Sequence, residues 1–160
     1  FASLIENNIR INSDKLATAL ENLALNNDML GWVTEIENIL DLLSNRDYQN
    51  FDEKYVKMLF ITLASLSPIY IIKSEAEIAG EYPDLMYLFR KPYKPNYQFL
   101  IELKYLKKSE SKKLPKTMEI ATQQVNRYLQ KPEISELESL KAYAIVFVSK
   151  KAHFHLVGGG

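Results

Sequence analysis

The spacing of apolar residues changes once along the chain, from the repeat of a helix to that of a strand. In the first fifty residues, apolar side chains return every three or four positions, which is the repeat of one helix face. One helix is predicted after the candidate N-caps Ser13 and Asp14, and a second over residues 29–43. Their inward stripes hold Leu16, Ala19, Leu20 and Leu23, and then Leu30, Val33, Ile36, Glu37 and Leu40. Residues 1–50 are therefore predicted to form a helical lead or connecting segment.

A third helix is predicted to begin near Phe51 or Asp52 and to end before Pro68, because proline cannot continue the helical hydrogen bonds. After Pro68 the chain becomes rich in β-branched and aromatic residues between turn residues. This pattern predicts strands at residues 69–73, 85–89 and 98–106, separated by a turn at 80–83 and a loop at 92–96.

The last third of the chain returns to a helix and then to strands. The lysine-rich residues 107–116 are predicted to be a loop, and Thr117 to cap a helix that ends near residue 130, before Pro132. Residues 141–149 are almost continuously apolar, which predicts a strand buried on both faces. Residues 152–157 are expected to add an edge strand. The order of elements indicates an α/β domain built on a mixed sheet.

Charge is divided unevenly along a chain whose formal net charge is zero. Residues 1–53 hold ten acidic and three basic residues, and residues 54–160 hold ten acidic and seventeen basic ones. The basic part is a candidate for binding an anionic partner, although solvated surface charge is the equally simple alternative.

Composition excludes several kinds of site. The absence of cysteine rules out disulfides, thiolate zinc sites and cysteine nucleophiles, and it fits the reducing cytoplasm that we expect for this chain. The two histidines, His153 and His155, both lie near the end, which argues against a histidine-rich metal site. No apolar run reaches the roughly 18 residues of a membrane-spanning helix. The start, without Met or a signal peptide, suggests an internal piece of a longer polypeptide.

One cluster of polar residues is predicted beside the most apolar strands. Glu102 and Lys104 point to the same face of their strand, because side chains alternate. Asp84 opens the preceding strand, which a short loop should place antiparallel beside Glu102. Two carboxylates beside a lysine suit a hard divalent cation such as Mg²⁺ or Mn²⁺. The alternatives are a cross-strand ion pair for Glu102 and Lys104, and an ordinary turn residue for Asp84.

Pro83-Asp84 followed by Glu102-Leu103-Lys104 resembles the signature of the PD-(D/E)xK nuclease superfamily. Glu53 stands on the preceding helix, where many members carry a further acid, and Gln124 and Tyr128 match a Gln-x-x-x-Tyr pattern on the following helix. More closely, the chain resembles the C-terminal nuclease-like domain of bacterial proteins that begin with an AAA-type ATPase-like domain. The matching stretches are residues 50–55, 74–77, 81–84, 101–104 and 121–125.

The resemblance implies a restriction-endonuclease-like core: a helix, a three-stranded antiparallel meander, a helix and a further strand in a mixed central sheet. That domain would span residues 51–157, with 158–160 as a flexible tail. Asp84, Glu102 and the Leu103 carbonyl would bind the metal, and Lys104 would serve the attacking water. Glu53 and Gln124 would support them, with Tyr128 secondary. Two positions depart from the family pattern: Tyr82-Pro83 replaces a basic step, and Lys57 replaces a frequent histidine.

The function implied by the resemblance is that of a divalent-metal-dependent phosphodiester hydrolase acting on DNA or RNA, with DNA favoured. Lysines after the site are candidate contacts to the phosphate backbone, and the alternative for each is a solvated loop residue. They are Lys107, Lys108, Lys112 and Lys113. Gln124 has its own alternative, a core glutamine with satisfied hydrogen bonds.

Two other functions stay open at this point. One is a nuclease-fold module with weak or no catalysis that binds nucleic acid or protein within a larger ATPase-containing protein. The other is a hydrolase of another substrate, because fold does not fix function. A homodimer is a further possibility that the sequence does not decide.

Overall fold

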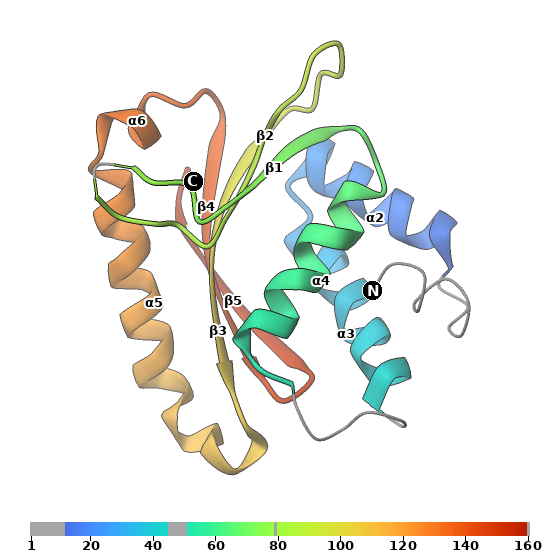
Figure 1. Cartoon of the computed structure of the whole chain (residues 1–160), viewed down its shortest axis with the longest axis vertical. Helices are drawn as coiled ribbons and strands as arrows, with labels where there is room; N and C mark the ends of the chain where they lie inside the picture. The colour runs from blue at the N-terminus through green and yellow to red at the C-terminus, as the bar shows by residue number, and fades with distance from the viewer. Residues whose placement is uncertain (1–11, 45–50, 79, 160) are drawn as a thin grey trace.

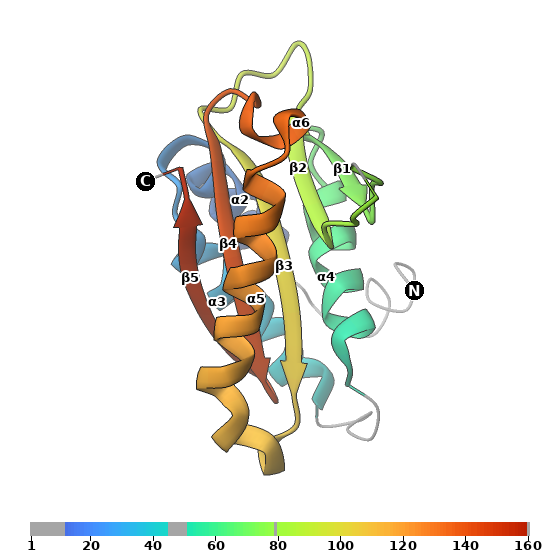
Figure 2. The ribbon, with the colours of Figure 1, turned by 90° about the vertical axis from the view of Figure 1, so that its left-hand side faces the viewer.

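A central sheet separates two layers of helices, as Figures 1 and 2 show. The computed structural model describes residues 12–44, 51–78 and 80–159. Helices α2 (Ser13–Asn26), α3 (Met29–Ser44) and α4 (Glu53–Ser65) cover one face of the sheet, and α5 (Leu114–Leu129) covers the other. Within these described ranges, no helix has both the length and the apolar character needed to cross a membrane.

The first two helices form where their apolar periods predict them, with differences at the ends. Asn12, rather than Ser13 or Asp14, caps α2, because its side chain accepts a hydrogen bond from the Lys15 amide at 3.1 Å. In α3 the inward stripe is displaced from the predicted one. Leu30 is 63% exposed, whereas the neighbouring Met29 and Trp32 are buried. The apolar period therefore predicted the helix correctly but one edge of its buried face wrongly.

Helix α4 positions part of the site, and its start is fixed by its cap. The Asp52 side chain accepts a hydrogen bond from the Tyr55 amide at 2.8 Å, so the helix begins at Glu53. Its buried face carries Val56, Leu59, Phe60, Leu63 and Ala64. The helix ends at Ser65, before Pro68 as predicted, and Leu66, which follows it, is 56% exposed.

The sheet has five strands in the order of the sequence. They are β1 (Tyr70–Ser74), β2 (Leu85–Phe89), β3 (Gln98–Leu106), β4 (Leu140–Val148) and β5 (Lys151–Gly158). The first three form an antiparallel meander, β3 and β4 are parallel, and β4 and β5 are antiparallel. The parallel step needs a crossover, which α5 supplies. This is the predicted mixed sheet, and the restriction-endonuclease-like core is confirmed.

The segment after β3 differs from the prediction. Residues 107–116 are not one loop, because a 3₁₀ helix, η1 (Lys108–Lys113), leads directly into α5 at Leu114. Thr117 therefore lies inside α5 and does not cap it. The reason is Pro115, which lies in the first turn of α5. Proline lacks an amide hydrogen, and in the first turn of a helix the amide groups have no partner within the helix, so nothing is lost there. The end of α5 at Leu129, before Pro132, is as predicted, and Pro132 begins the short helix α6 (Pro132–Ser135).

The last strand runs further than predicted. Gly158 belongs to β5 and is not part of a tail. A Cβ atom at Gly158 would lie 2.5 Å from Leu129 Cδ1, so a residue without a side chain lets the strand end pack closely against α5. The division of the chain at residue 50 stays a prediction. The described helices α2 and α3 share one hydrophobic core with the sheet.

Both faces of β3 are covered, which decides the environment of the polar cluster. Phe99, Ile101 and Leu103 point into the core shared with α2, α3 and α4. Leu100 points into a second, smaller core beneath α5, which also contains Ala121 and Val125. Glu102 points to the same face as Leu100, since side chains two residues apart in a strand share a face. A charged residue is thus inserted into an apolar layer.

Gln98 connects the beginning of β3 to two neighbouring segments. Its Oε1 accepts a hydrogen bond from the Phe89 amide at 2.9 Å, and its Nε2 donates one to the Glu138 carbonyl at 2.9 Å. The residue is only 6% exposed. Its amide therefore supplies partners to backbone groups that water reaches poorly.

We expect Gln98→Leu to lower the free energy of unfolding by about 2–3 kcal/mol, because two partly buried backbone groups lose their partners. Urea denaturation followed by circular dichroism measures the change. Gln123→Leu is the matched control, since Gln123 is exposed and its side chain bonds to the exposed Glu119 side chain. Equal stabilities for the two variants would contradict this role of Gln98.

Candidate active site

The site forms where β3 continues beyond the start of β2. The two strands pair from Leu85 with Ile101 to Tyr87 with Phe99, whereas β3 pairs with β4 along all nine of its residues. Continuing the antiparallel register by one step sets Asp84 opposite Glu102. Because β2 supplies no backbone partner at this level, the Leu103 amide donates instead to Asp84 Oδ2 at 2.8 Å. Asp84 is thereby fixed against β3 while only 8% exposed.

Glu102 carries a buried carboxyl group with one oxygen bound and one open. Oε1 accepts a hydrogen bond from Lys104 Nζ at 3.2 Å. Oε2 is buried and has no hydrogen-bond partner among the described residues. Burial, and then the negative charge of Asp84, raise the pKa of Glu102 to about 7, against its usual value of 4.5. A cation that binds this carboxyl group must therefore compete with the proton that the group retains near neutral pH.

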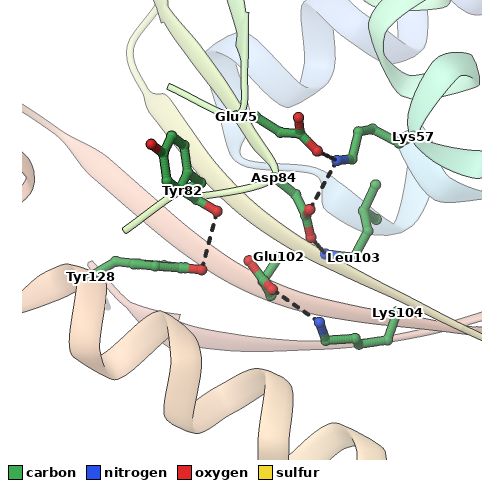
Figure 3. A network of polar contacts seen from close by, with 8 residues as sticks. All are labelled: Lys57, Glu75, Tyr82, Asp84, Glu102, Leu103, Lys104 and Tyr128. Carbon is green, nitrogen blue, oxygen red and sulfur yellow. Dashed lines mark hydrogen bonds and ion pairs between the residues drawn. The ribbon is translucent and has the colours of Figure 1, made fainter. Parts of the chain in front are cut away.

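Helix α4 brings Glu53 and Lys57 to the same place, one helical turn apart. Lys57 Nζ lies 3.1 Å from Asp84 Oδ1 and 2.8 Å from Glu75 Oε1, contacts that Figure 3 draws as dashed lines. Burial opposes the charge on Lys57, but the hydrogen bonds to Glu75 and Asp84 outweigh it and raise the pKa of the ammonium. Burial raises the pKa of Glu53, Lys104 lowers it and Asp84 adds to the rise, so Glu53 lies within electrostatic reach of both.

Helix α5 closes the site from the other side. The Tyr128 hydroxyl donates to the Tyr82 carbonyl at 3.3 Å. Burial, and then the charges of Glu102 and Asp84, raise the pKa of Tyr128, so its hydroxyl lies within electrostatic reach of both carboxylates. Gln124 is half-buried, and its Oε1 has no hydrogen-bond partner among the described residues. The amide is therefore not the fully satisfied core glutamine of the alternative interpretation.

Comparison with known families decides the ancestry of this arrangement. The sequence profile of the PD-(D/E)XK nuclease superfamily matches residues 51–155. The chain belongs to this superfamily. A search of curated protein sequences found no match. The matched residues contain α4, almost the whole sheet and α5, and thus every element that contributes a side chain to the cluster around Asp84.

Members of this superfamily generally use divalent metal ions. The residues present here fit a metal ion that takes few ligands from the protein. Within the described ranges, no group of three or more His, Cys, Asp or Glu side chains is arranged to hold a metal. Mg²⁺ does not require such a cage, since it is commonly bound by one or two carboxylates together with waters and substrate phosphate. The open, buried Oε2 of Glu102 and the adjacent Asp84 supply that kind of donor set.

The Leu103 carbonyl, predicted as a further ligand, faces the same side. The amide and carbonyl of one strand residue point toward the same neighbouring strand in an antiparallel pair. Because the Leu103 amide reaches Asp84, its carbonyl points toward the side where β2 is absent. Whether it binds a metal stays a prediction.

The lysines predicted to contact nucleic acid lie beyond the end of β3. Lys107 and Lys108 begin five residues after Glu102, a distance of roughly 16 Å along a strand. Lys107, Lys108 and Lys112 are exposed and make no ion pair that the described residues show. Lys113, by contrast, pairs with Glu110 at 3.0 Å. These lysines therefore lie beyond the carboxylates along the chain, and their contact with nucleic acid stays a prediction.

Two residues of the cluster were not assigned a role from the sequence. Lys57 was noted only as a departure from the family pattern, and Glu75 only as part of a matching stretch. The available signal was the four-residue spacing between Glu53 and Lys57, which puts both on one face of α4. No local signal predicts Glu75, because its contact with Lys57 depends on the packing of α4 against β1.

In metal-free protein, we expect the free energy of unfolding to decrease as pH rises from about 5 to about 7. In this range the native state holds a proton on Glu102 that the unfolded chain has already lost, so raising the pH favours unfolding. The decrease amounts to at most about 3 kcal/mol, at roughly 1.4 kcal/mol per pKa unit. Urea denaturation in the presence of a chelator, repeated across this range, measures it.

Glu102→Gln should remove most of this pH dependence, whereas Glu119→Gln, which changes an exposed carboxyl on α5, should retain it. Parallel curves for the wild type and Glu102→Gln would show that Glu102 titrates normally.

Proposed function

We propose that this chain is a divalent-metal-dependent phosphodiester hydrolase that cleaves nucleic acid. The observation that carries the proposal is the convergence of Asp84 and Glu102, two buried carboxylates, in the nuclease superfamily fold, with Lys104 bound to one of them. Membership in the superfamily supports a nuclease-type function, and the buried open oxygen of Glu102 supports the use of a cation.

Each residue has a distinct proposed task. A divalent cation bound by Asp84 and Glu102, with the Leu103 carbonyl as a further ligand, would neutralise the charge that develops on the scissile phosphate. Asp84 keeps its orientation because the Leu103 amide donates to Oδ2. Lys104, which lies 3.2 Å from Glu102 Oε1, would orient the attacking water and help remove its proton. Such a cation would be held by two residues of β3 and by Asp84, which directly precedes β2.

The helices on either side support these groups. Glu53 adds negative charge from α4, and Lys104 and Asp84 both act on its pKa. Gln124, with its open carbonyl oxygen, and Tyr128, with its hydroxyl within electrostatic reach of the carboxylates, contribute from α5. We propose that both α5 residues orient water or the carboxylates and do not take part in bond cleavage.

The proposed substrate and setting follow from the exposed lysines after β3 and from the resemblance of the sequence. The exposed Lys107, Lys108 and Lys112, together with Lys113, would attract the phosphate backbone of DNA, favoured here over RNA, in a sequence-independent way. The resemblance to C-terminal domains of AAA-ATPase-like proteins suggests that the chain works in the cytoplasm as part of a longer polypeptide. Association into a homodimer is compatible with this proposal, and sedimentation velocity would test it.

The proposal predicts cleavage of single- or double-stranded DNA or RNA by the purified chain in Mg²⁺ or Mn²⁺. Asp84→Asn and Lys104→Ala should each reduce the rate by about 100-fold or more, because each removes a group that acts on the transition state. Gel electrophoresis of end-labelled substrates, with and without a chelator, measures the rates.

Glu21→Gln and Lys15→Ala, which change exposed residues of α2, are the matched controls and should retain full activity. Thermal melts must show that all four variants fold. If all four variants cleave at the same rate, the activity does not come from the site at Asp84 and Lys104. If the wild type binds nucleic acid without cleaving it, the chain is the weakly catalytic or inactive binding module.

The lysines after β3 predict a second, separable effect. In an Asp84→Asn background, replacing Lys107, Lys108 and Lys112 together with alanine should weaken DNA binding and flatten its salt dependence. Each lost phosphate contact reduces the slope of log K against log salt concentration by about 0.9 for duplex DNA. Fluorescence anisotropy at several salt concentrations measures this slope. An unchanged slope would leave these residues as an ordinary solvated segment.

A further inference from the structure

Lys57 occupies the one Asp84 oxygen that the backbone does not bind. Figure 3 shows its side chain reaching from α4 between Glu75 and Asp84. Its side chain is only 12% exposed, and Nζ lies 3.1 Å from Asp84 Oδ1. The other oxygen, Oδ2, accepts the Leu103 amide hydrogen at 2.8 Å. Both oxygens of Asp84 are therefore engaged by the protein itself.

The two carboxylates of the site differ in this respect. Glu102 has Lys104 on Oε1 and leaves Oε2 without a partner, whereas each oxygen of Asp84 already has one partner, Lys57 on Oδ1 and the Leu103 amide on Oδ2. A cation that reached Asp84 Oδ1 would lie within a few ångströms of the Lys57 ammonium, and like charges this close repel strongly in a partly buried site. The metal and Lys57 are therefore competitors for the same oxygen.

Glu75 provides Lys57 with a second carboxylate partner. Its Oε1 lies 2.8 Å from Lys57 Nζ, and its side chain is 66% exposed. The backbone of Glu75 has a left-handed conformation with φ of 51°, which a non-glycine residue adopts uncommonly. The Glu75 amide donates a hydrogen bond to the Asp84 carbonyl at 3.2 Å. The backbone of Glu75 is therefore bound to Asp84, and both side chains contact Lys57.

We propose that Lys57 is a positioning residue that neutralises Asp84 in the metal-free protein and is displaced toward Glu75 when a divalent cation binds. The inference rests on the proposed function, since it assumes that Asp84 is a metal ligand. Lys57 then keeps the acidic cluster folded without metal and lowers the affinity of the site for metal. Glu75 has the opposite effect on affinity, because it stabilises the displaced position of Lys57.

The test measures the dissociation constant of Mn²⁺ alone for the full chain, from the electron paramagnetic resonance signal of free Mn²⁺. Lys57→Met should bind Mn²⁺ at least about tenfold more tightly than Lys54→Met, which removes the same charge from an exposed position of α4. Lys57→Met should also melt at a lower temperature than Lys54→Met without metal. Lys57→Arg should restore affinity close to that of the wild type.

Glu75→Gln gives an independent test in which the fold is not at risk, because the side chain is exposed. It should weaken Mn²⁺ binding about threefold or more relative to Glu77→Gln, a charge-matched control two residues away. A structural role for the ion pair alone would change the melting temperature without these opposite changes in Mn²⁺ affinity.

The outcomes separate this inference from the proposed function. If Mn²⁺ binding depends on Asp84 but Lys57→Met matches Lys54→Met, the competition is wrong and the nuclease site stands. If Asp84→Asn binds Mn²⁺ like the wild type, or if neither the wild type nor Lys57→Met binds it, both proposals fall. Weak binding by the wild type that becomes strong in Lys57→Met supports the competition directly.

Discussion

The site depends on a carboxylate being held in an apolar layer. Glu102 is 3% exposed on the face of β3 beneath α5, where Leu100, Ala144 and Val125 form the core. A charge in such surroundings is costly unless it is paired, and the pKa of about 7 reflects this cost. Lys104 offsets part of it, and Tyr128 encloses it further. The environment that destabilises the ionised group in the metal-free protein is the same one that favours a bound cation.

A second constraint is the unequal length of strand pairing. β3 follows β4 through its whole length but follows β2 only as far as Ile101. The Leu103 amide would be an unsatisfied buried donor there, and the Asp84 carboxylate satisfies it. Backbone hydrogen bonding therefore orients one carboxylate, and apolar packing positions the other. Glu102 stands within β3, and Asp84 directly precedes β2 and is bound to the Leu103 amide of β3.

Local patterns in the sequence were sufficient for most elements. The β-branched and aromatic residues at 98–106 predicted β3, and the alternation of side chains in a strand predicted that Glu102 and Lys104 share a face. The errors lie at element ends and at single faces, such as Thr117, which lies inside α5, and Leu30, which faces solvent. These depend on energy differences of about 1 kcal/mol between neighbouring caps or rotations, which a single sequence does not resolve.

The sequence by itself determined the α/β class, the order of its elements, and the residue types that stand at the centre of the site, because those follow from the period of apolar residues and from the short signature at Asp84 and Glu102. Only the tertiary structure decided which lysine ammonium groups lie beside which carboxylates. Lys57 and Glu75 are 18 residues apart and meet because α4 packs beside the β1–β2 hairpin. Contacts of this kind arise from the packing of whole elements, and no local pattern encodes them.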